Sequence, residues 1–133
     1  MVVYLSLPDV VALHALVMER TGAAPMPLRD AGRLESALMR PQMAAHYSNA
    51  DLIGQAAVLA VGISQAQAFL EGNKRTAFAG CDVFLRLNGL RFQGDPIEFA
   101  RRLEVVAART GDLETATAGF EAWLRQHTRP VGD

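Results

Sequence analysis

The stretch DLIGQAAVLAVGISQAQAFLEGNKRTAFAGCDVFLRL, residues 51–87, contains two apolar patterns of helical period with a short break between them. In the first half, apolar residues recur every three or four positions, at Leu52, Ala56, Leu59 and Ile63. One further turn of this stripe reaches Gln67, so we expect Gln67 to face inwards. The second stripe predicts a helix that starts near Asn73, and its members are Ala77, Phe78, Cys81, Phe84 and Leu85. The stretch therefore predicts two packed helices joined by a loop over residues 66–72.

Helix signals continue on the N-terminal side of this stretch. Ser6 is typical of an N-cap, and the apolar spacing after it predicts a helix over residues 7–20. We expect the segment Thr21–Pro27 to end that helix, because it contains a glycine and two prolines. Asp30 is placed to cap a second helix, whose apolar residues are Leu34, Ala37 and Leu38.

We expect Pro41 to end the second helix, because proline lacks the N–H that a helix interior needs. Residues 41–49 have no clear period, and two interpretations remain open for them, a loop or a short flap-like hairpin. On the C-terminal side, Asn88–Gly89 is a stop signal, and Asp95 caps a fifth helix that runs to about residue 108. A last helix follows, and we expect the tail over residues 128–133 to be frayed.

The pattern as a whole predicts an all-α fold. We expect a compact bundle of about six helices in one domain that spans residues 1–133. A chain of 133 residues, of which 50% are hydrophobic and 20% charged, is large enough to bury a core without disulfides. The single cysteine, Cys81, cannot form an intramolecular disulfide.

Charge and hydropathy exclude several classes of function. Thirteen basic residues against fourteen acidic ones leave a net charge of −1, so we expect no direct binding to nucleic acid. No apolar run approaches the ~20 residues of a membrane span, and the first residues do not resemble a secretion signal. We therefore expect a cytoplasmic protein with no membrane partner. Lys74 is the one lysine in an arginine-rich chain, a bias typical of GC-rich bacterial genomes.

The start of the helix near Asn73 carries the residue types of a phosphate site. Gly72 and Asn73 stand where a loop becomes a helix, and free backbone N–H groups at a helix start bind anions. Lys74 adds a point charge, and Arg75 adds a planar fork that takes two phosphate oxygens. Glu71 supplies an oxygen ligand for Mg²⁺, which commonly binds one or two carboxylates plus substrate phosphates. From spacing alone, a capped helix with solvated charges remains an equal alternative.

The run QAFLEGNKRTA, residues 67–77, resembles the Fic/Doc family motif H-x-F-x-[D/E]-[G/A]-N-[G/K]-R at every specified position except the first. The likeness is greatest to the Doc (death-on-curing) toxin branch. It covers nearly the whole chain, with further similar runs at residues 4–5, 9–10, 14, 28–30, 34–38, 40–42, 84–85 and 87–89.

The resemblance implies a compact all-α fold that binds ATP or a related nucleotide with magnesium and transfers part of it to a protein hydroxyl. Most Fic members transfer AMP, whereas Doc-type toxins with Asn-Lys-Arg resemble kinases that phosphorylate the translation elongation factor Tu. A separate, Phd-like antitoxin is the partner that the resemblance implies.

Carried over residue by residue, the resemblance places Glu71 on magnesium and Gly72, Asn73, Lys74 and Arg75 around the nucleotide phosphates. It also implies that Phe69 anchors the loop in the core.

Gln67 is the departure from the motif, because it stands where the family has the histidine that takes the proton of the target hydroxyl. Glutamine is not a base, and loss of a general base typically lowers a rate by about 10² to 10⁴. Phosphoryl transfer depends mainly on positioning and electrostatics, so a glutamine that orients the nucleophile is compatible with reduced activity. Two hypotheses remain open: a Doc-like toxin with catalytic candidates Gln67, Glu71, Lys74 and Arg75, and a catalytically inactive Fic-like module that binds nucleotide or a partner.

The remaining polar residues have simpler interpretations. We expect His14, beside the apolar stripe of the first helix, to be structural and His127 to be solvated. His46 is a candidate for target contact or for a replacement base. Asp82 is a candidate for a paired contact between helices, and Arg101–Arg102 for a solvated helix face.

Overall fold

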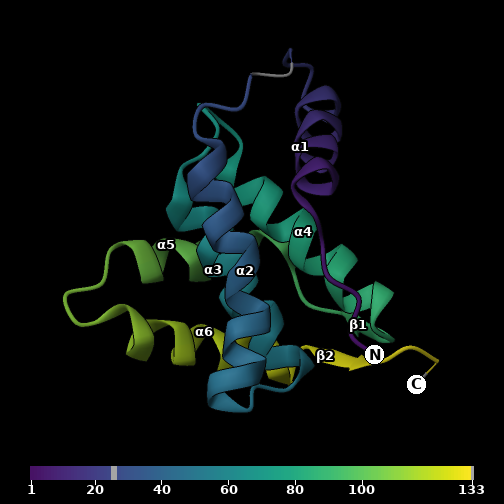
Figure 1. Ribbon diagram of the computed structural model, residues 1–133, viewed down its shortest axis with the longest axis vertical. Helices are drawn as coiled ribbons and strands as arrows, with labels where there is room; N and C mark the ends of the chain where they lie inside the picture. The colour runs from purple at the N-terminus through teal and green to yellow at the C-terminus, as the bar shows by residue number, and fades with distance from the viewer. Residues whose placement is uncertain (25–26, 133) are drawn as a thin grey trace.

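The computed structural model describes residues 1–24 and 27–132, and within them it contains six α-helices and a two-stranded sheet (Figure 1). The helices are α1 (Leu7–Arg20), α2 (Ala31–Ser48), α3 (Leu52–Ala66), α4 (Asn73–Leu87), α5 (Pro96–Ala107) and α6 (Leu113–Gln126). The strands β1 (Leu90–Phe92) and β2 (Thr128–Pro130) pair antiparallel. The prediction of an all-α bundle of about six helices is confirmed, with the addition of these two short strands. Two residues named in the expectations lie outside the described residues: Pro25, in the segment expected to end the first helix, and Asp133, at the end of the tail expected to be frayed.

The helix around which the others pack is α3. It contacts α2, α4, α5 and α6, and its buried residues surround the helix instead of following one face. Such a helix belongs inside a core. Small residues bring α2 close to it, since a Cβ built on Gly62 would lie 3.3 Å from the Cβ of Ala37. Apolar as α3 is, no helix in residues 1–24 and 27–132 has the length and hydropathy to cross a membrane.

An aromatic cluster attaches the C-terminal helices to α4. Its rings meet edge to face or tilted, and they belong to Phe78, Phe92, Phe99, Phe120 and Trp123. Pairs of this geometry contribute about 0.5–1.5 kcal/mol each beyond the burial of their area. The cluster joins α4, β1, α5 and α6 into one core.

Side-chain caps begin five of the six helices in the described part of the chain. Each cap accepts a hydrogen bond from a backbone N–H of the first turn, and the five are Ser6, Asp30, Asp51, Asp95 and Asp112. The N-caps predicted at Ser6, Asp30 and Asp95 are confirmed. The first helix also has the predicted bounds, and α4 begins at Asn73 as expected.

The prediction that Pro41 ends the second helix is wrong. α2 continues through Pro41 to Ser48, so residues 41–48 form neither a loop nor a flap hairpin. The proline removes one helical hydrogen bond, but its ring is buried on the face that α2 packs against α3. Burial of that face outweighs the missing bond, and the helix ends only at Asn49, which has a left-handed φ of 57°.

The tail is not frayed over residues 128–130, where it forms β2. Phe92 pairs with Thr128, and the N–H of Gln93 donates to the carbonyl of His127 at 2.7 Å. Thr128 is buried. The strand has no alternation of apolar and polar residues, so its sequence did not indicate a strand.

The carboxylate of Asp51 both caps α3 and forms an ion pair, and two substitutions separate these contributions to stability. It accepts from the N–H of Gly54 at 2.9 Å and pairs with Arg125 of α6 at 2.8 Å. We expect Asp51→Ala to lower the free energy of unfolding by about 1–2 kcal/mol near neutral pH, because the cap is lost. Asp51→Asn keeps a capping oxygen and removes only the charge, so it should cost less than about 1 kcal/mol.

The pH dependence of the second variant follows from the same contact. The hydrogen bond from Arg125 lowers the pKa of Asp51 in the folded state. The ionic contribution is therefore present above the unfolded pKa, about 3.9, and is lost as the pH falls through the folded value. In urea unfolding, the difference between wild type and Asp51→Asn should shrink from about pH 7 to about pH 3. A difference independent of pH would contradict the role of the ion pair.

Candidate active site

The N-terminus of α4 differs from those of the other helices. Gly72 is its N-cap residue, and among the described residues no side chain bonds to this helix start. The first helical hydrogen bond runs from the N–H of Thr76 to the carbonyl of Gly72 at 2.9 Å. The N–H groups of Asn73, Lys74 and Arg75 precede that bond and have no partner within the helix. Free N–H groups and the helix dipole make this end of α4 suitable for an anion.

Two features of the backbone require glycine at position 72. Its φ is +80°, in the left-handed region that side chains disfavour. A Cβ would also lie 2.8 Å from the Sδ of Met18 and 3.5 Å from the ring of His14. Helix α1 therefore approaches the chain closely at the point where α4 begins.

The side chain of Asn73 holds the loop between α3 and α4. Its Oδ1 accepts from the N–H of Phe69 at 3.1 Å, and its Nδ2 donates to the carbonyl of Phe69 at 2.8 Å. Both residues are buried, which confirms the prediction that Phe69 anchors the loop. Because the amide of Asn73 is used inside the loop, its backbone N–H is the group left for a ligand.

His14 supports the same loop from α1. Its Nε2 lies 2.9 Å from the carbonyl oxygen of Glu71, and its ring stacks on Phe69 with the centroids 3.7 Å apart. A carbonyl only accepts, so Nε2 carries the proton in this contact. With 1% of its surface exposed, His14 has the structural role that its position predicted.

The segment before α2 covers the loop on another side. Leu28 forms an isolated antiparallel bridge with Phe69, and the N–H of Arg29 donates to the carbonyl of Ala68 at 2.8 Å. In Figure 1 the loop lies at the upper end of the molecule, beside the beginning of α2. The loop is thus fixed by α1, by α4 and by the segment that leads into α2.

Two arginines, one just before α2 and one in its first turn, bind the end of α3. The guanidinium of Arg29 donates to the carbonyl of Gln67 at 2.7 Å, and that of Arg33 donates to the carbonyl of Ala66 at 3.4 Å. The last carbonyls of a helix carry partial negative charge, so cations are stabilising there. Sequence reasoning missed both roles, because each contact joins residues more than thirty positions apart and no local pattern indicates it.

The prediction that Gln67 continues the inward stripe of α3 is wrong. The helix ends at Ala66, and Gln67 has a left-handed φ of 50° and is exposed. Its amide Nε2 donates to the carbonyl of Ser64 at 2.9 Å. A left-handed residue turns the chain out of the helix, so the helical stripe cannot be extended through it.

Both cations of the motif are exposed at the start of α4. The Nζ of Lys74 lies 2.9 Å from the Oε1 of Glu104 on α5. The two side chains are 43% and 61% exposed, and ion pairs of that kind contribute less than about 1 kcal/mol. If a phosphate oxygen replaces the carboxylate of Glu104 as the partner of Lys74, the loss of this ion pair therefore costs little free energy.

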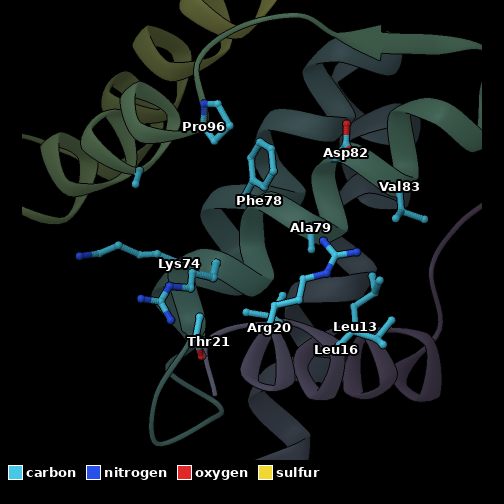
Figure 2. Close-up of a pocket in the computed structure, with 13 residues that line it drawn as sticks. Leu13, Leu16, Arg20, Thr21, Lys74, Phe78, Ala79, Asp82, Val83 and Pro96 are labelled. Atoms are coloured by element: carbon cyan, nitrogen blue, oxygen red, sulfur yellow. The ribbon is translucent and has the colours of Figure 1, made fainter. Parts of the chain in front are cut away.

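A groove of about 450 Å³ runs beside this helix start, between α1, α4 and α5. Figure 2 shows Leu13 and Leu16 of α1 on one side and Ala79 of α4 facing them, while Lys74 extends away from α1. The walls are mostly apolar, and Arg75 is among the charged residues that line the groove.

Glu71 is exposed immediately before α4. Among the residues that the structure describes, no three His, Cys, Asp or Glu side chains gather as a metal cage. A single carboxylate nevertheless suits Mg²⁺, which keeps several waters and takes further ligands from substrate phosphates. The residues present fit a metal that arrives with a nucleotide.

His46 does not approach the loop. Asp30 is next to the loop, since its N–H donates to the carbonyl of Ala68. At about 1.5 Å per residue, His46 lies about 24 Å further along α2. It cannot replace a base at position 67.

Two further expectations need correction. Asp82 pairs with Arg86 at 3.2 Å, one turn along the same helix and not between helices. His127 is partly buried, with its Nδ1 2.9 Å from the carbonyl of Trp123 and its ring against the indole. The prediction of a solvated face at Arg101 and Arg102 is confirmed, since both are exposed, and the guanidinium of Arg102 also lies over the Trp123 ring at 5.6 Å.

The hydrogen bonds of Asn73 predict a large effect on stability. Asn73→Ala leaves the buried N–H and carbonyl of Phe69 without partners, and we expect it to lower the free energy of unfolding by about 2–4 kcal/mol. Lys74→Ala, at the next position, removes only an exposed ion pair and should cost less than about 1 kcal/mol. Urea unfolding of the two variants checks this. Equal midpoints would show that Asn73 does not hold the loop.

Comparison with known proteins gives three matches. The sequence model of the Fic/DOC family matches residues 4–85. The chain is 36% identical over 104 residues to "Toxin Doc" of Mycolicibacterium smegmatis, a match that covers 73% of this chain and 80% of that protein. It is 31% identical over 115 residues to "Protein kinase doc" of Escherichia phage P1, which covers 86% and 88% of the two chains. The matched residues 4–85 include the α3–α4 loop and the first turns of α4.

Proposed function

The chain belongs to the Fic/DOC family, and from this premise we propose that it is a Doc-like toxin that transfers part of a nucleotide to a protein hydroxyl. The observation that carries the proposal is the start of α4, which no side chain caps and which lies between one carboxylate and two cations. The names of the two relatives, a toxin and a protein kinase, support the same reaction class. Residues 1–133 would form one domain with this activity.

The proposed site binds the nucleotide by its phosphates. The N–H groups of Asn73, Lys74 and Arg75 surround one phosphate, and Gly72 lets it approach the backbone closely. The guanidinium of Arg75 takes two further oxygens. Glu71 would hold Mg²⁺, which when bound neutralises part of the phosphate charge.

The transfer itself forms a bond between the target oxygen and a phosphorus of ATP. In phosphoryl transfer ADP leaves, and in AMP transfer pyrophosphate leaves. The target hydroxyl loses its proton to water or to an oxygen of the transferred phosphate, because Gln67 cannot take it. Its carbonyl end can only accept a hydrogen bond and orient the hydroxyl, which is compatible with a loose phosphoryl transition state.

The alternative is a Fic-like module that binds nucleotide or a partner without turnover. One observation favours it: the side chain at position 67 is not a base, and its amide is bonded back to Ser64. The two functions share the phosphate site and differ only in transfer. For the transferase, elongation factor Tu is the proposed target and a Phd-like antitoxin the proposed partner.

The metal ligand and the phosphate ligand can be separated by calorimetry with ATP. We expect Glu71→Ala to weaken ATP binding about tenfold in magnesium and hardly at all in EDTA, because its carboxylate contacts the metal and not the phosphates. Arg75→Ala should weaken binding about tenfold or more in both buffers. Equal loss for Glu71→Ala in the two buffers would contradict its metal role, and unchanged binding for Arg75→Ala would contradict the phosphate site.

Transfer is tested by restoring a base. ATP labelled at the α or the γ phosphate is incubated with elongation factor Tu and wild type, Gln67→His or Gln67→Asn. Histidine and asparagine both tolerate the left-handed φ at this position, but only histidine is a base. We expect Gln67→His to raise incorporation of one label by about 10² to 10⁴, while Gln67→Asn, which adds no base, should not exceed wild type.

The label that becomes covalent distinguishes phosphoryl transfer, which carries the γ phosphate, from AMP transfer, which carries the α phosphate. If Gln67→His binds ATP but incorporates neither label, the non-catalytic module replaces the transferase.

A further inference from the structure

A second groove, of about 340 Å³, lies between α2 and α3, and Arg33 is one of the residues that line it. It exists because the two helices cross over small residues. Gly62 and Ala37 lie at the crossing, and a Cβ on Gly62 would already approach Ala37 to 3.3 Å. Ser36 and Gln65 add polar groups to the lining. The volume is within the range of ligand sites, about 300–1,000 Å³.

The charge of this groove is entirely of one sign. The charged residues that line it are Arg33 and Arg40, which lie about two turns apart on α2. Arg33 is partly neutralised by Asp30 at 3.5 Å. Arg40 is exposed, and within the described residues it makes no ion pair or side-chain hydrogen bond. A free arginine presents a planar fork that suits a carboxylate.

The groove leads directly to the motif loop. Ala66 lines it and is the residue before Gln67, and Arg33 donates to the carbonyl of Ala66. Arg29, bonded to the carbonyl of Gln67, adds a further positive charge at the same end. A polypeptide that lies in the groove and continues past Ala66 therefore brings its next residues close to Gln67.

We infer that the α2–α3 groove binds an acidic segment of the target protein, next to the hydroxyl that is modified. This inference rests on the proposed function for the role of position 67. Arg33 and Arg40 are seven residues apart on a helix, or about 10 Å. An extended chain rises about 3.3 Å per residue, so two carboxylates about three residues apart match the two arginines. The acid that meets Arg33 is the one closer to the hydroxyl.

Peptide binding tests the inference without nucleotide. The probes are two fluorescein-labelled peptides with one Thr each, one carrying two Asp residues three positions apart beside the Thr and the other carrying Asn at those positions. We expect the wild-type chain to bind the Asp peptide about tenfold more tightly in fluorescence anisotropy. Arg40→Gln should reduce that preference about fivefold, and Arg101→Gln, the same charge change at an exposed site on α5, should not.

Several outcomes would overturn the inference. Equal affinity for the two peptides would do so, as would a preference that survives Arg40→Gln. Loss of ATP binding by Arg40→Gln in calorimetry would place the groove in the nucleotide site instead. Tighter binding of a 12-nucleotide oligouridylate would make it a nucleic-acid surface. If the wild-type chain prefers the Asp peptide through Arg40 but Gln67→His binds ATP and transfers no label to elongation factor Tu, the proposed function is contradicted and the groove assignment stands.

Discussion

The two hydrogen bonds between the side chain of Asn73 and the backbone of Phe69 are the interaction on which the candidate site depends. An asparagine at the start of a helix commonly bonds to the helix itself, and here it bonds backwards to the loop. The N–H groups of the first turn remain free because the N-cap residue, Gly72, has no side chain to bond them. The ring of Phe69 is at the same time fixed in the core, where His14 stacks on it.

The backbone of the loop is held by many hydrogen bonds although the side chains of its candidate site residues are exposed. Backbone groups carry the restraint: the carbonyls of residues 66–69 and 71 are all bonded to side chains or to N–H groups of α1, α2, α4 and the segment before α2. The side chains of Gln67, Glu71 and Arg75 need not contribute to stability and are available to ligands. A preorganised backbone with solvent-accessible side chains is what transfer by positioning requires.

Local signals predicted the helices well because caps and apolar spacing act over a few residues. The start of α1 at Leu7 and of α4 at Asn73 followed from such signals. Three expectations failed where a distant contact decides the structure: Pro41 is kept helical by packing on α3, β2 exists only because β1 lies beside it, and Gln67 leaves its helix. The motif residues around Gly72 were found from the sequence, whereas Arg29 and Arg33 were not, since their partners are far along the chain.

The pairing of β1 with β2 has a consequence for the order in which the chain folds. Phe92 meets Thr128 only after 36 further residues have been made, whereas Phe69 and Asn73 are four residues apart. During synthesis the motif loop can close early, but the aromatic cluster lacks Phe120 and Trp123 until α6 has emerged. A nascent chain would thus carry a formed motif loop on an unfinished core, and the last helix and strand determine when the protein becomes stable.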